Sequence, residues 1–333
     1  MDMQIQENQI QEDQTDFSPM RSPLDSEKQA RHTFNYMLLC VFGLFVYVNV
    51  IELLLARVIH SVAPSFEDST WYQLFLTAVA FYGTGIPLFY LLSKHIPDGQ
   101  KRPERKLAWW KLGIFALISF FLMYTSNIVS VAVNYGIGRL FQIELTNPLE
   151  DVLAEMNMGV IFLMTVVLAP IFEEFTFRKI LLGKLLPYGE GVAILVSGIV
   201  FGLFHGNLSQ CLYAAVLGIV FGYIVAKTGR IRYTIILHMI VNFVGSVAAI
   251  CVLKVQSIVA VMLFGLGVIF VYCAGLILFI LTLTFKKIKL EPTEAEIPKG
   301  FRLRIALCNP GMILFFIATV ISSVLYVISA YSG

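Results

Sequence analysis

The sequence predicts an all-α, polytopic integral membrane protein with about eight to nine transmembrane helices around a polar cavity inside the membrane. Three observations predict this fold. Hydrophobic residues make up 58% of the 333-residue chain, which is too apolar for a soluble domain. They gather in stretches of about 20 residues, the length that a helix needs to cross a hydrocarbon core of about 30 Å. Polar side chains interrupt only a few of these stretches.

Residues 1–32 differ in composition from the rest of the chain. They are rich in Gln, Asp, Glu and Ser and contain a single Phe. Such a segment cannot bury enough apolar surface to fold, so we predict a disordered tail. It also lacks the basic start and adjoining apolar core of a cleavable signal peptide. Residues 33–333 form the predicted membrane domain.

Nine stretches of this domain are candidate membrane spans. The fifth and sixth are short, and only the sequence GNLSQ separates them. The nine stretches cover residues 34–58, 71–93, 109–134, 158–178, 191–207, 210–227, 232–253, 257–285 and 310–331.

The distribution of basic residues predicts the orientation. If the N-terminal tail is cytoplasmic, 21 of the 24 Lys and Arg residues fall on the cytoplasmic side. The other three, Arg57, Arg139 and Lys254, fall outside. Because cytoplasmic loops carry the excess of Lys and Arg, we expect a multi-pass protein of the cell membrane with its N-terminus in the cytoplasm.

Small residues recur every four positions in the fifth and sixth spans. Gly198, Gly202 and Gly206 form one such row, and Ala214, Gly218 and Gly222 form another. Rows of this kind let helix backbones approach closely in a membrane. We therefore predict that these two spans pack tightly on each other or on the fourth span.

Two adjacent glutamates, Glu173 and Glu174, lie near the end of the fourth span. A charge at the bilayer centre costs about 2.5–3.5 kcal/mol, so each carboxylate needs a partner or solvent. Arg178 follows Glu174 by four residues and shares its helix face, whereas Glu173 has no such partner in its own helix. Taken alone, the pair is equally consistent with a position at the membrane–water boundary.

Two of the five histidines, His205 and His238, lie inside apolar stretches, and Asn242 follows His238 by one helical turn. Buried polar groups need partners, so we predict that these three side chains and Glu173 share one site. At about 1.5 Å per residue, Glu173 lies about 16 Å from Lys184, whereas His238 lies about 9 Å from Arg232. Helix tilt or a later start of the seventh helix must bring the two to one level.

A carboxylate and a neutral imidazole on one cavity hold and deprotonate water. A second imidazole and a carboxamide supply donors to a developing oxyanion. The same set also leaves a metalloenzyme open, with Glu173, His205 and His238 holding a zinc ion that lowers the pKa of its water to about 7. The zinc-protease motif H-E-x-x-H is not in the sequence.

The polar residues fall into three motifs, EEFTFR (173–178), FGLFH (201–205) and HMIVN (238–242). In this order, on successive spans, they resemble the CPBP family of CAAX proteases and bacteriocin-processing enzymes. This family is also called Abi and includes the type II CAAX prenyl endopeptidases. The resemblance covers a catalytic core at about residues 150–253.

The resemblance implies an intramembrane endopeptidase that cuts a membrane-anchored protein or peptide near the cytoplasmic side, and lipidated CaaX-type proteins are the substrate class of the family precedent. It leaves open whether the mechanism depends on a glutamate or on a metal. The implied roles are Glu173 as general base, His205 as its assistant, His238 and Asn242 as oxyanion stabilisers, Glu174 as support and Arg178 as its ion-pair partner.

Three other functions remain as alternatives. A bacteriocin immunity or leader-processing protein would use the same residues. A non-catalytic membrane scaffold would not need Glu173 or His205. A transporter would show inverted repeats, whereas the polar residues here crowd into 173–242. A formal net charge of +2 indicates no nucleic-acid partner, and the expected partners are the lipid bilayer and a membrane-anchored substrate.

Overall fold

The structure is a computed structural model that describes residues 23–97, 104–143, 145, 157–291 and 299–332. Within these ranges it consists of helices and connecting turns, without a strand. Eight of the helical segments are long and apolar enough to cross a membrane, and a ninth apolar helix has only 15 residues. All nine predicted spans are helical, which confirms the all-α polytopic fold.

Several spans are single rods made of successive helix types. Three such rods run from α3 to α4, from α7 to α9 and from α12 to α13. In chain order the elements are α2 (Pro23–Val62), η1 (Pro64–Phe66), α3 (Tyr72–Thr77), η2 (Ala78–Gly85), α4 (Ile86–Ser93), α5 (Trp109–Phe141), α7 (Met158–Ile161), η3 (Phe162–Leu168), α8 (Ala169–Glu173), η4 (Glu174–Leu182), α9 (Gly183–Leu185), η5 (Leu186–Tyr188), α10 (Glu190–Phe204), α11 (Leu208–Thr228), α12 (Arg232–Asn242), η6 (Phe243–Ala248), α13 (Ala249–Lys254), α14 (Ile258–Thr284), α15 (Lys299–Leu307) and α16 (Pro310–Ser332).

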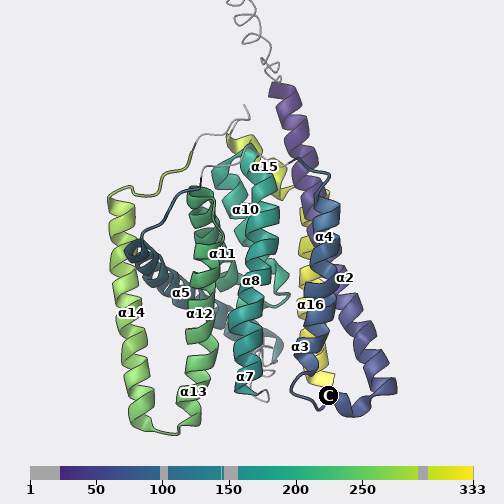
Figure 1. The fold of residues 1–333 in the computed structure, drawn as a ribbon, viewed down its shortest axis with the longest axis vertical. Coiled ribbons are helices and arrows are strands. Elements are labelled where there is room, and N and C mark those ends of the chain that lie inside the picture. The colour runs from purple at the N-terminus through teal and green to yellow at the C-terminus, as the bar shows by residue number, and fades with distance from the viewer. Residues whose placement is uncertain (1–22, 98–103, 144, 146–156, 292–298, 333) are drawn as a thin grey trace, which may run out of the picture.

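The helices form one bundle with α10 and α11 at its centre (Figure 1). On one side of this pair α5 packs against α11, and α14 packs against α5. On the other side α2 and α16 pack together. The rod that contains α8 and η4 contacts both α10 and α12. Segments far apart in the sequence therefore enclose the middle of the bundle.

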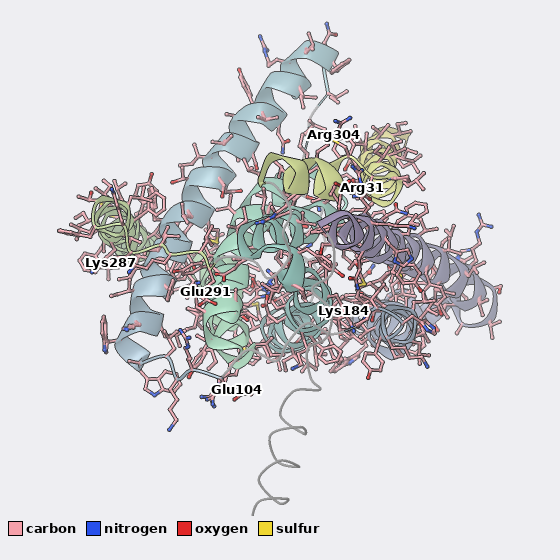
Figure 2. All side chains as sticks on the ribbon, turned by 90° about the horizontal axis from the view of Figure 1, so that it is seen from above. Arg31, Glu104, Lys184, Lys287, Glu291 and Arg304 are labelled. Carbon is pink, nitrogen blue, oxygen red and sulfur yellow. The ribbon has the colours of Figure 1, made fainter. Side chains whose placement is uncertain are left out.

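Charged side chains gather at the end of the bundle where α2 begins. Figure 2 looks onto this end and labels Arg31, Glu104, Lys184, Lys287, Glu291 and Arg304. Some of them pair across the helices: Lys227 Nζ lies 2.6 Å from an oxygen of Glu190 and 3.5 Å from one of Glu291. This end is the one that the sequence assigns to the cytoplasm.

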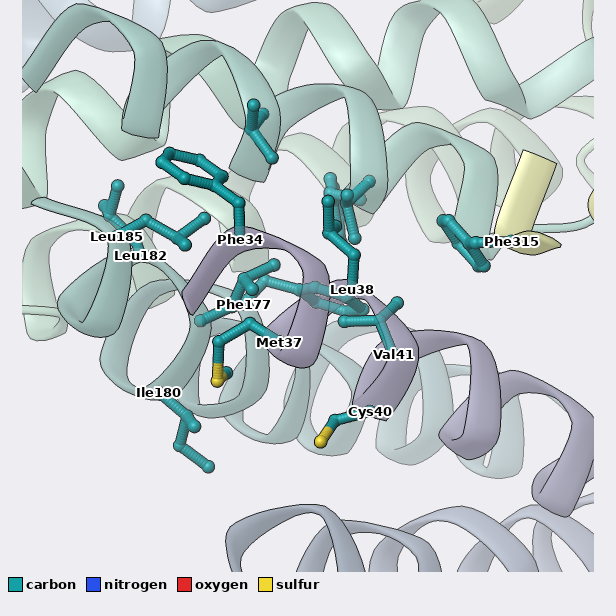
Figure 3. Packing of buried hydrophobic residues seen from close by; sticks show 14 of the residues in the cluster. Phe34, Met37, Leu38, Cys40, Val41, Phe177, Ile180, Leu182, Leu185 and Phe315 are labelled. Atoms are coloured by element: carbon teal, nitrogen blue, oxygen red, sulfur yellow. The ribbon is translucent and has the colours of Figure 1, made fainter. Parts of the chain in front are cut away.

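The largest apolar core lies where α2 meets the rod of η4 and α9 (Figure 3). Phe34 and Leu38 of α2 are fully buried there, as are Phe177 and Leu182 of the rod. The side chains of α2 that face this core recur every three or four residues, which is the period of one helix face. The packing fixes the rod that carries the two glutamates.

The predicted close approach of α10 and α11 is confirmed. A Cβ placed on Gly198 would lie 2.9 Å from the carbonyl oxygen of Ala215, and one on Gly218 would lie 2.8 Å from Cα of Gly198. A Cβ on Gly202 would collide with the carbonyl oxygen of Cys211. The absent side chains therefore let the two backbones touch.

The first helix begins earlier than the composition of the tail indicates. Helix α2 starts at Pro23, so residues 23–32 of the expected tail form its first turns. The 40 residues of α2 extend over about 60 Å, twice the thickness of a hydrocarbon core, and its first turns project beyond the bundle in Figure 1. Residues 1–22 lie outside the described residues.

Candidate active site

The rod from α7 to α9 is irregular where it carries the glutamates. Its π-helical runs η3 and η4 flank the short helix α8, which contains Pro170. Proline lacks a backbone N–H and disturbs the regular ladder, and π turns are frequent at functional sites. Glu173 is the last residue of α8 and Glu174 the first of η4, so both glutamates lie at the change of helix type.

The His238 side chain lies between the two carboxylates. Its Nδ1 is 3.3 Å from Oε1 of Glu174, and its Nε2 is 3.7 Å from Oε2 of Glu173. The Glu174 side chain is fully buried, whereas 18% of the Glu173 side chain is exposed. The two neighbouring glutamates therefore contact the same imidazole from opposite ring nitrogens.

Arg178 lies against the other oxygen of Glu174. Its Nε is 3.4 Å from Oε2, and both side chains are fully buried. The guanidinium carbon lies 4.3 Å from the ring centre of Phe201 and 5.9 Å from that of Phe221. A cation over an aromatic face is attracted by the ring quadrupole, so these two rings and the Glu174 carboxylate together stabilise the positive charge of Arg178.

His205 follows the last residue of α10. Its ring packs edge-on against Phe201, with 5.1 Å between the ring centres. Phe201 in turn lies perpendicular to the His238 ring at 5.8 Å. Phe201, the first phenylalanine of FGLFH, thus contacts both histidines and the guanidinium of Arg178.

The turn after α10 is held by its own side chains. Gly206 has φ +64°, a conformation that favours glycine, and its carbonyl accepts a hydrogen bond from Ser323 Oγ at 2.8 Å. Asn207 caps α11 by accepting from Gln210 N at 2.9 Å, and its amide donates to Gln210 Oε1 at 2.7 Å. These bonds fix the position of His205 at the start of the turn.

Asn242 lies one turn after His238 and is held through its amide. Nδ2 donates to the Thr165 carbonyl oxygen at 2.8 Å. The hydroxyl groups of Thr165 and Ser246 are 3.3 Å apart, and Ser246 Oγ donates to the carbonyl of Asn242. This network joins η3 to η6 beside the imidazole.

A cavity of about 400 Å³ brings four of the six predicted site residues together: Glu173, His205, His238 and Asn242. Glu174 and Arg178 do not line it and lie behind the His238 ring. The remaining lining residues are Thr77, Phe81, Tyr82, Met123, Tyr124, Asn127, Met164, Thr165, Ala169, Phe201, Gln210, Tyr213, Ala214, Leu217, Val241, Gly245 and Ser246.

The difference in depth between the glutamates and His238 is resolved by the helices themselves. The 3.7 Å contact shows that Glu173 and His238 lie at one level. Helix α12 starts at Arg232, so the seventh span does not begin late. The segment after Glu173 is π-helical as far as Leu182, and its wider turns make it shorter than an α-helix of equal length. The π-helical run thus shortens the distance between Glu173 and the charged end of its rod, which helps to bring Glu173 and His238 together.

Several cavity residues carry no signal in the sequence. The Tyr82 ring stacks on Phe172 at 4.2 Å, next to Glu173 in the chain, and Tyr124 and Asn127 reach the cavity from α5. These residues lie in spans outside the motifs. A single Tyr or Asn in an apolar stretch is typical of ordinary helix packing, so only the folded bundle identifies them.

The described residues contain no group of three His, Cys, Asp or Glu side chains placed to hold a metal ion. In the predicted zinc set of Glu173, His205 and His238, both ring nitrogens of His238 face carboxylates. The guanidinium of Arg178 also lies beside one of these carboxylates. A zinc-bound imidazole commonly donates its other ring N–H to a carboxylate, so a His238 that binds zinc through Nε2 and donates Nδ1–H to Glu174 is compatible with the predicted zinc set, and the metal-dependent mechanism stays an alternative.

Comparison with known proteins agrees with the three motifs. A family model for the type II CAAX prenyl endopeptidase Rce1-like domain matches residues 156–244. The "Putative membrane peptidase YdiL" of Bacillus subtilis (strain 168) is 31% identical over 183 residues, which is 54% of this chain and 73% of that protein. The "Membrane-embedded CAAX protease MroQ" of Staphylococcus aureus (strain USA300) is 25% identical over 149 residues, 43% of this chain and 58% of that protein. No solved structure gives a significant match.

Proposed function

Because the chain belongs to the family of Rce1-like type II CAAX prenyl endopeptidases, we propose that its intramembrane cavity hydrolyses a peptide bond in a membrane-anchored protein or peptide. Family membership makes the protein a membrane protease. One relative is named a CAAX protease, so a lipidated CaaX-type peptide is the first substrate class to test.

The observation that carries the proposed mechanism is the difference between the two glutamates. Glu174 uses one oxygen for His238 and the other for Arg178. Glu173 lines the cavity and is partly exposed. In this proposal Glu173 is the general base that takes a proton from water, and His205, on the same cavity, holds that water through its imidazole.

The oxyanion of the tetrahedral intermediate needs hydrogen-bond donors on the same cavity. Asn242 uses Nδ2 for the Thr165 carbonyl, and an amide nitrogen carries a second hydrogen that this bond does not use. His238 donates Nδ1–H to Glu174 in this proposal, so a second proton on Nε2 makes it an imidazolium that donates to the oxyanion. The adjacent carboxylates compensate that positive charge.

The proton that Glu173 takes from water passes to the leaving amine in the second half of the reaction. Water adds to the scissile carbonyl carbon while its proton moves to the Glu173 carboxylate, and His238 and Asn242 stabilise the negative oxygen. Collapse of the intermediate breaks the C–N bond, and the protonated Glu173 gives its proton to the leaving amine. Glu174 and Arg178 orient His238 without touching the substrate. The base therefore starts and ends as a carboxylate.

The test is cleavage by the full-length protein in nanodiscs, with a lipidated CaaX peptide and a panel of membrane-anchored peptides as substrates. We expect Glu173→Gln to lower kcat by at least a hundredfold, because general-base catalysis contributes about 10²–10⁴. The matched control is Glu67→Gln, which removes a carboxylate 3.2 Å from Nδ1 of His60, and neither of these residues lines the cavity. This variant should keep its activity.

Equal cleavage by the wild type and Glu173→Gln would remove Glu173 as the base. Cleavage of no peptide by the wild type would favour the immunity or scaffold alternatives over a processing protease. The metal content of each sample, measured on the same preparation, tests the alternative in which activity follows bound zinc.

A further inference from the structure

A second pocket lies at the charged end of the bundle, away from the active-site cavity. It encloses about 360 Å³ beside the first turn of α12, and no residue lines both pockets. Figure 2 shows Glu104, one of its lining residues, at the rim of this end. We call it the basic pocket; its lining residues are Glu104, Phe175, Lys179, Gly229, Arg230, Ile231 and Arg232.

The backbone around the basic pocket is fixed by hydrogen bonds. Gly229 has φ +67° and ends α11, with its N–H donating to the Val225 carbonyl at 2.8 Å. The segment before α5 is attached to this turn twice. Arg105 N donates to the Thr228 carbonyl at 2.9 Å, and Leu107 N donates to the Tyr233 hydroxyl at 2.9 Å. The pocket is therefore built into the fold.

The pocket walls carry an excess of positive charge. Three cations, Lys179, Arg230 and Arg232, face a single carboxylate, Glu104. Arg230 Nε lies 2.8 Å from that carboxylate, so this pair neutralises itself. Lys179 and Arg232 are exposed, and Arg232 donates to the Tyr233 hydroxyl at 3.0 Å, which is a neutral partner. Two positive charges thus remain for an anionic ligand.

Exposed apolar side chains lie on the two rods that contribute to the basic pocket. Helices α8 and α12 pack side by side (Figure 1), and Ile171 and Phe175 of the first rod are exposed. Ile240 and Phe243 of the second rod are also exposed, and the Phe243 ring lies 6.5 Å from that of Phe162. We call these exposed apolar side chains the apolar seam. In a bilayer they contact acyl chains.

We propose that the basic pocket binds the phosphate headgroup of an anionic glycerophospholipid, whose acyl chains lie along the apolar seam. Basic pockets between transmembrane helices on the cytoplasmic side are suited to such headgroups. The pocket supplies Lys179 and Arg232 for the phosphate, and Phe175 lies in both the pocket and the seam. A soluble anion would use the pocket alone.

A lipid at this position contacts the two rods that carry the candidate catalytic groups. Lys179 belongs to η4, which follows Glu173, and Arg232 starts the helix of His238. A ligand that binds only the folded state stabilises it. Bound anionic lipid therefore stabilises the packing of η4 against α12, whatever reaction the cavity performs.

The experiment uses the full chain in a neutral detergent with dioleoyl-phosphatidylglycerol or dioleoyl-phosphatidylcholine added. Native mass spectrometry measures bound lipid, and thermal unfolding measures stabilisation. We expect phosphatidylglycerol to bind more tightly and the double variant Lys179→Gln/Arg232→Gln to lose about thirtyfold in affinity, since each basic residue near an anionic membrane contributes about fivefold.

Two further variants test the charge argument in opposite directions. Glu104→Gln releases Arg230 and should tighten phosphatidylglycerol binding about fivefold. Lys286→Gln/Lys287→Gln removes two exposed lysines from the same end of the bundle, outside the basic pocket. This variant should bind phosphatidylglycerol with the affinity of the wild type.

Equal affinity of the wild type and Lys179→Gln/Arg232→Gln would overturn the proposal, as would equal binding of the two lipids. Competition with inorganic phosphate distinguishes a lipid headgroup from a soluble anion as the ligand. If millimolar phosphate does not displace phosphatidylglycerol, the lipid is the ligand. If phosphate displaces it and stabilises the protein as strongly as the lipid does, the pocket is a soluble-anion site and the lipid proposal is wrong.

Discussion

Among the described residues, Arg178 is the largest fully buried side chain. A guanidinium in this position persists only with a nearby compensating charge, and Glu174 supplies it at 3.4 Å. The sequence indicates this pair through the i, i+4 spacing. It does not indicate that His238 joins it at 3.3 Å, because that contact joins residues 64 positions apart. The i, i+4 spacing therefore predicts the Glu174–Arg178 pair, whereas tertiary packing brings His238 to it.

The first prediction concerns stability. Removing one partner of a buried ion pair leaves an uncompensated charge, so Arg178→Met should destabilise the protein by about 3–5 kcal/mol. Thermal unfolding in detergent measures the loss. Arg31→Met breaks an exposed pair with Glu27 and serves as the control, with an expected change within about 1 kcal/mol.

The double variant Glu174→Gln/Arg178→Met separates charge from packing. The carboxamide that replaces the Glu174 carboxylate still accepts from His238 and carries no negative charge. The double variant should therefore be more stable than Arg178→Met alone. Strictly additive losses would show that the two side chains do not stabilise each other.

The second prediction concerns the oxyanion. Asn242→Ala should lower kcat by about 10²–10³ with little change in KM, because its donor acts on charge that develops in the transition state. Asn134→Ala is the matched control, since Asn134 is a buried asparagine of α5 that donates to Ser209 at 2.8 Å. A higher KM with unchanged kcat would instead assign Asn242 to substrate binding.

The element that positions His205 is the hairpin of α10 and α11. The repeat of small residues every four positions predicts its close packing, and the structure confirms it. The π-helical runs of the fourth and seventh spans could not be predicted, because no residue pattern distinguishes a π turn from an α turn in an apolar stretch. These runs set the height of Glu173 relative to His238, so the depth of the site follows from the structure alone.

The third prediction tests the hairpin. A Cβ on Gly202 meets the carbonyl oxygen of Cys211 and the side chain of Ala215, so Gly202→Ala should destabilise by about 1–3 kcal/mol through overpacking. Gly222→Ala is the control, because its Cβ would lie 3.4 Å from Ile194, an ordinary contact. Thermal unfolding of the two variants in the same detergent gives the comparison. Equal thermal stability of the two variants would show that the hairpin of α10 and α11 accommodates a methyl group at position 202 without loss of stability.

At the scale of the whole molecule, composition and spacing predict the nine helices and the motifs that meet at the cavity. They do not predict which other spans complete its wall. Tyr82 and Tyr124 come from the second and third spans, and nothing in their local sequence separates them from packing residues. The arrangement of α5 and η2 around the central hairpin decides this, and it depends on contacts between segments distant in sequence.

The fourth prediction concerns orientation. In a chain without its five cysteines, Lys289→Cys should react with a membrane-impermeant maleimide only after the cell membrane is opened, whereas Gln256→Cys should react in intact cells. Both residues are exposed; Gln256 lies in the turn before α14, and Lys289 lies in the segment that follows α14. The reverse pattern would place the N-terminus outside and would contradict the distribution of Lys and Arg.

The short helix α10 also determines the depth at which His205 lies. Its 15 residues extend over about 22 Å, so the turn after His205 ends well inside a hydrocarbon core of about 30 Å. Non-helical backbone persists at that depth only inside protein or beside a hydrated space, and here Gln210 joins His205 on the cavity wall. Gly206 in this turn is buried, and its carbonyl accepts from Ser323 of α16, so protein surrounds the turn. The short α10 therefore places His205 at the depth of the cavity, away from the far surface of the membrane.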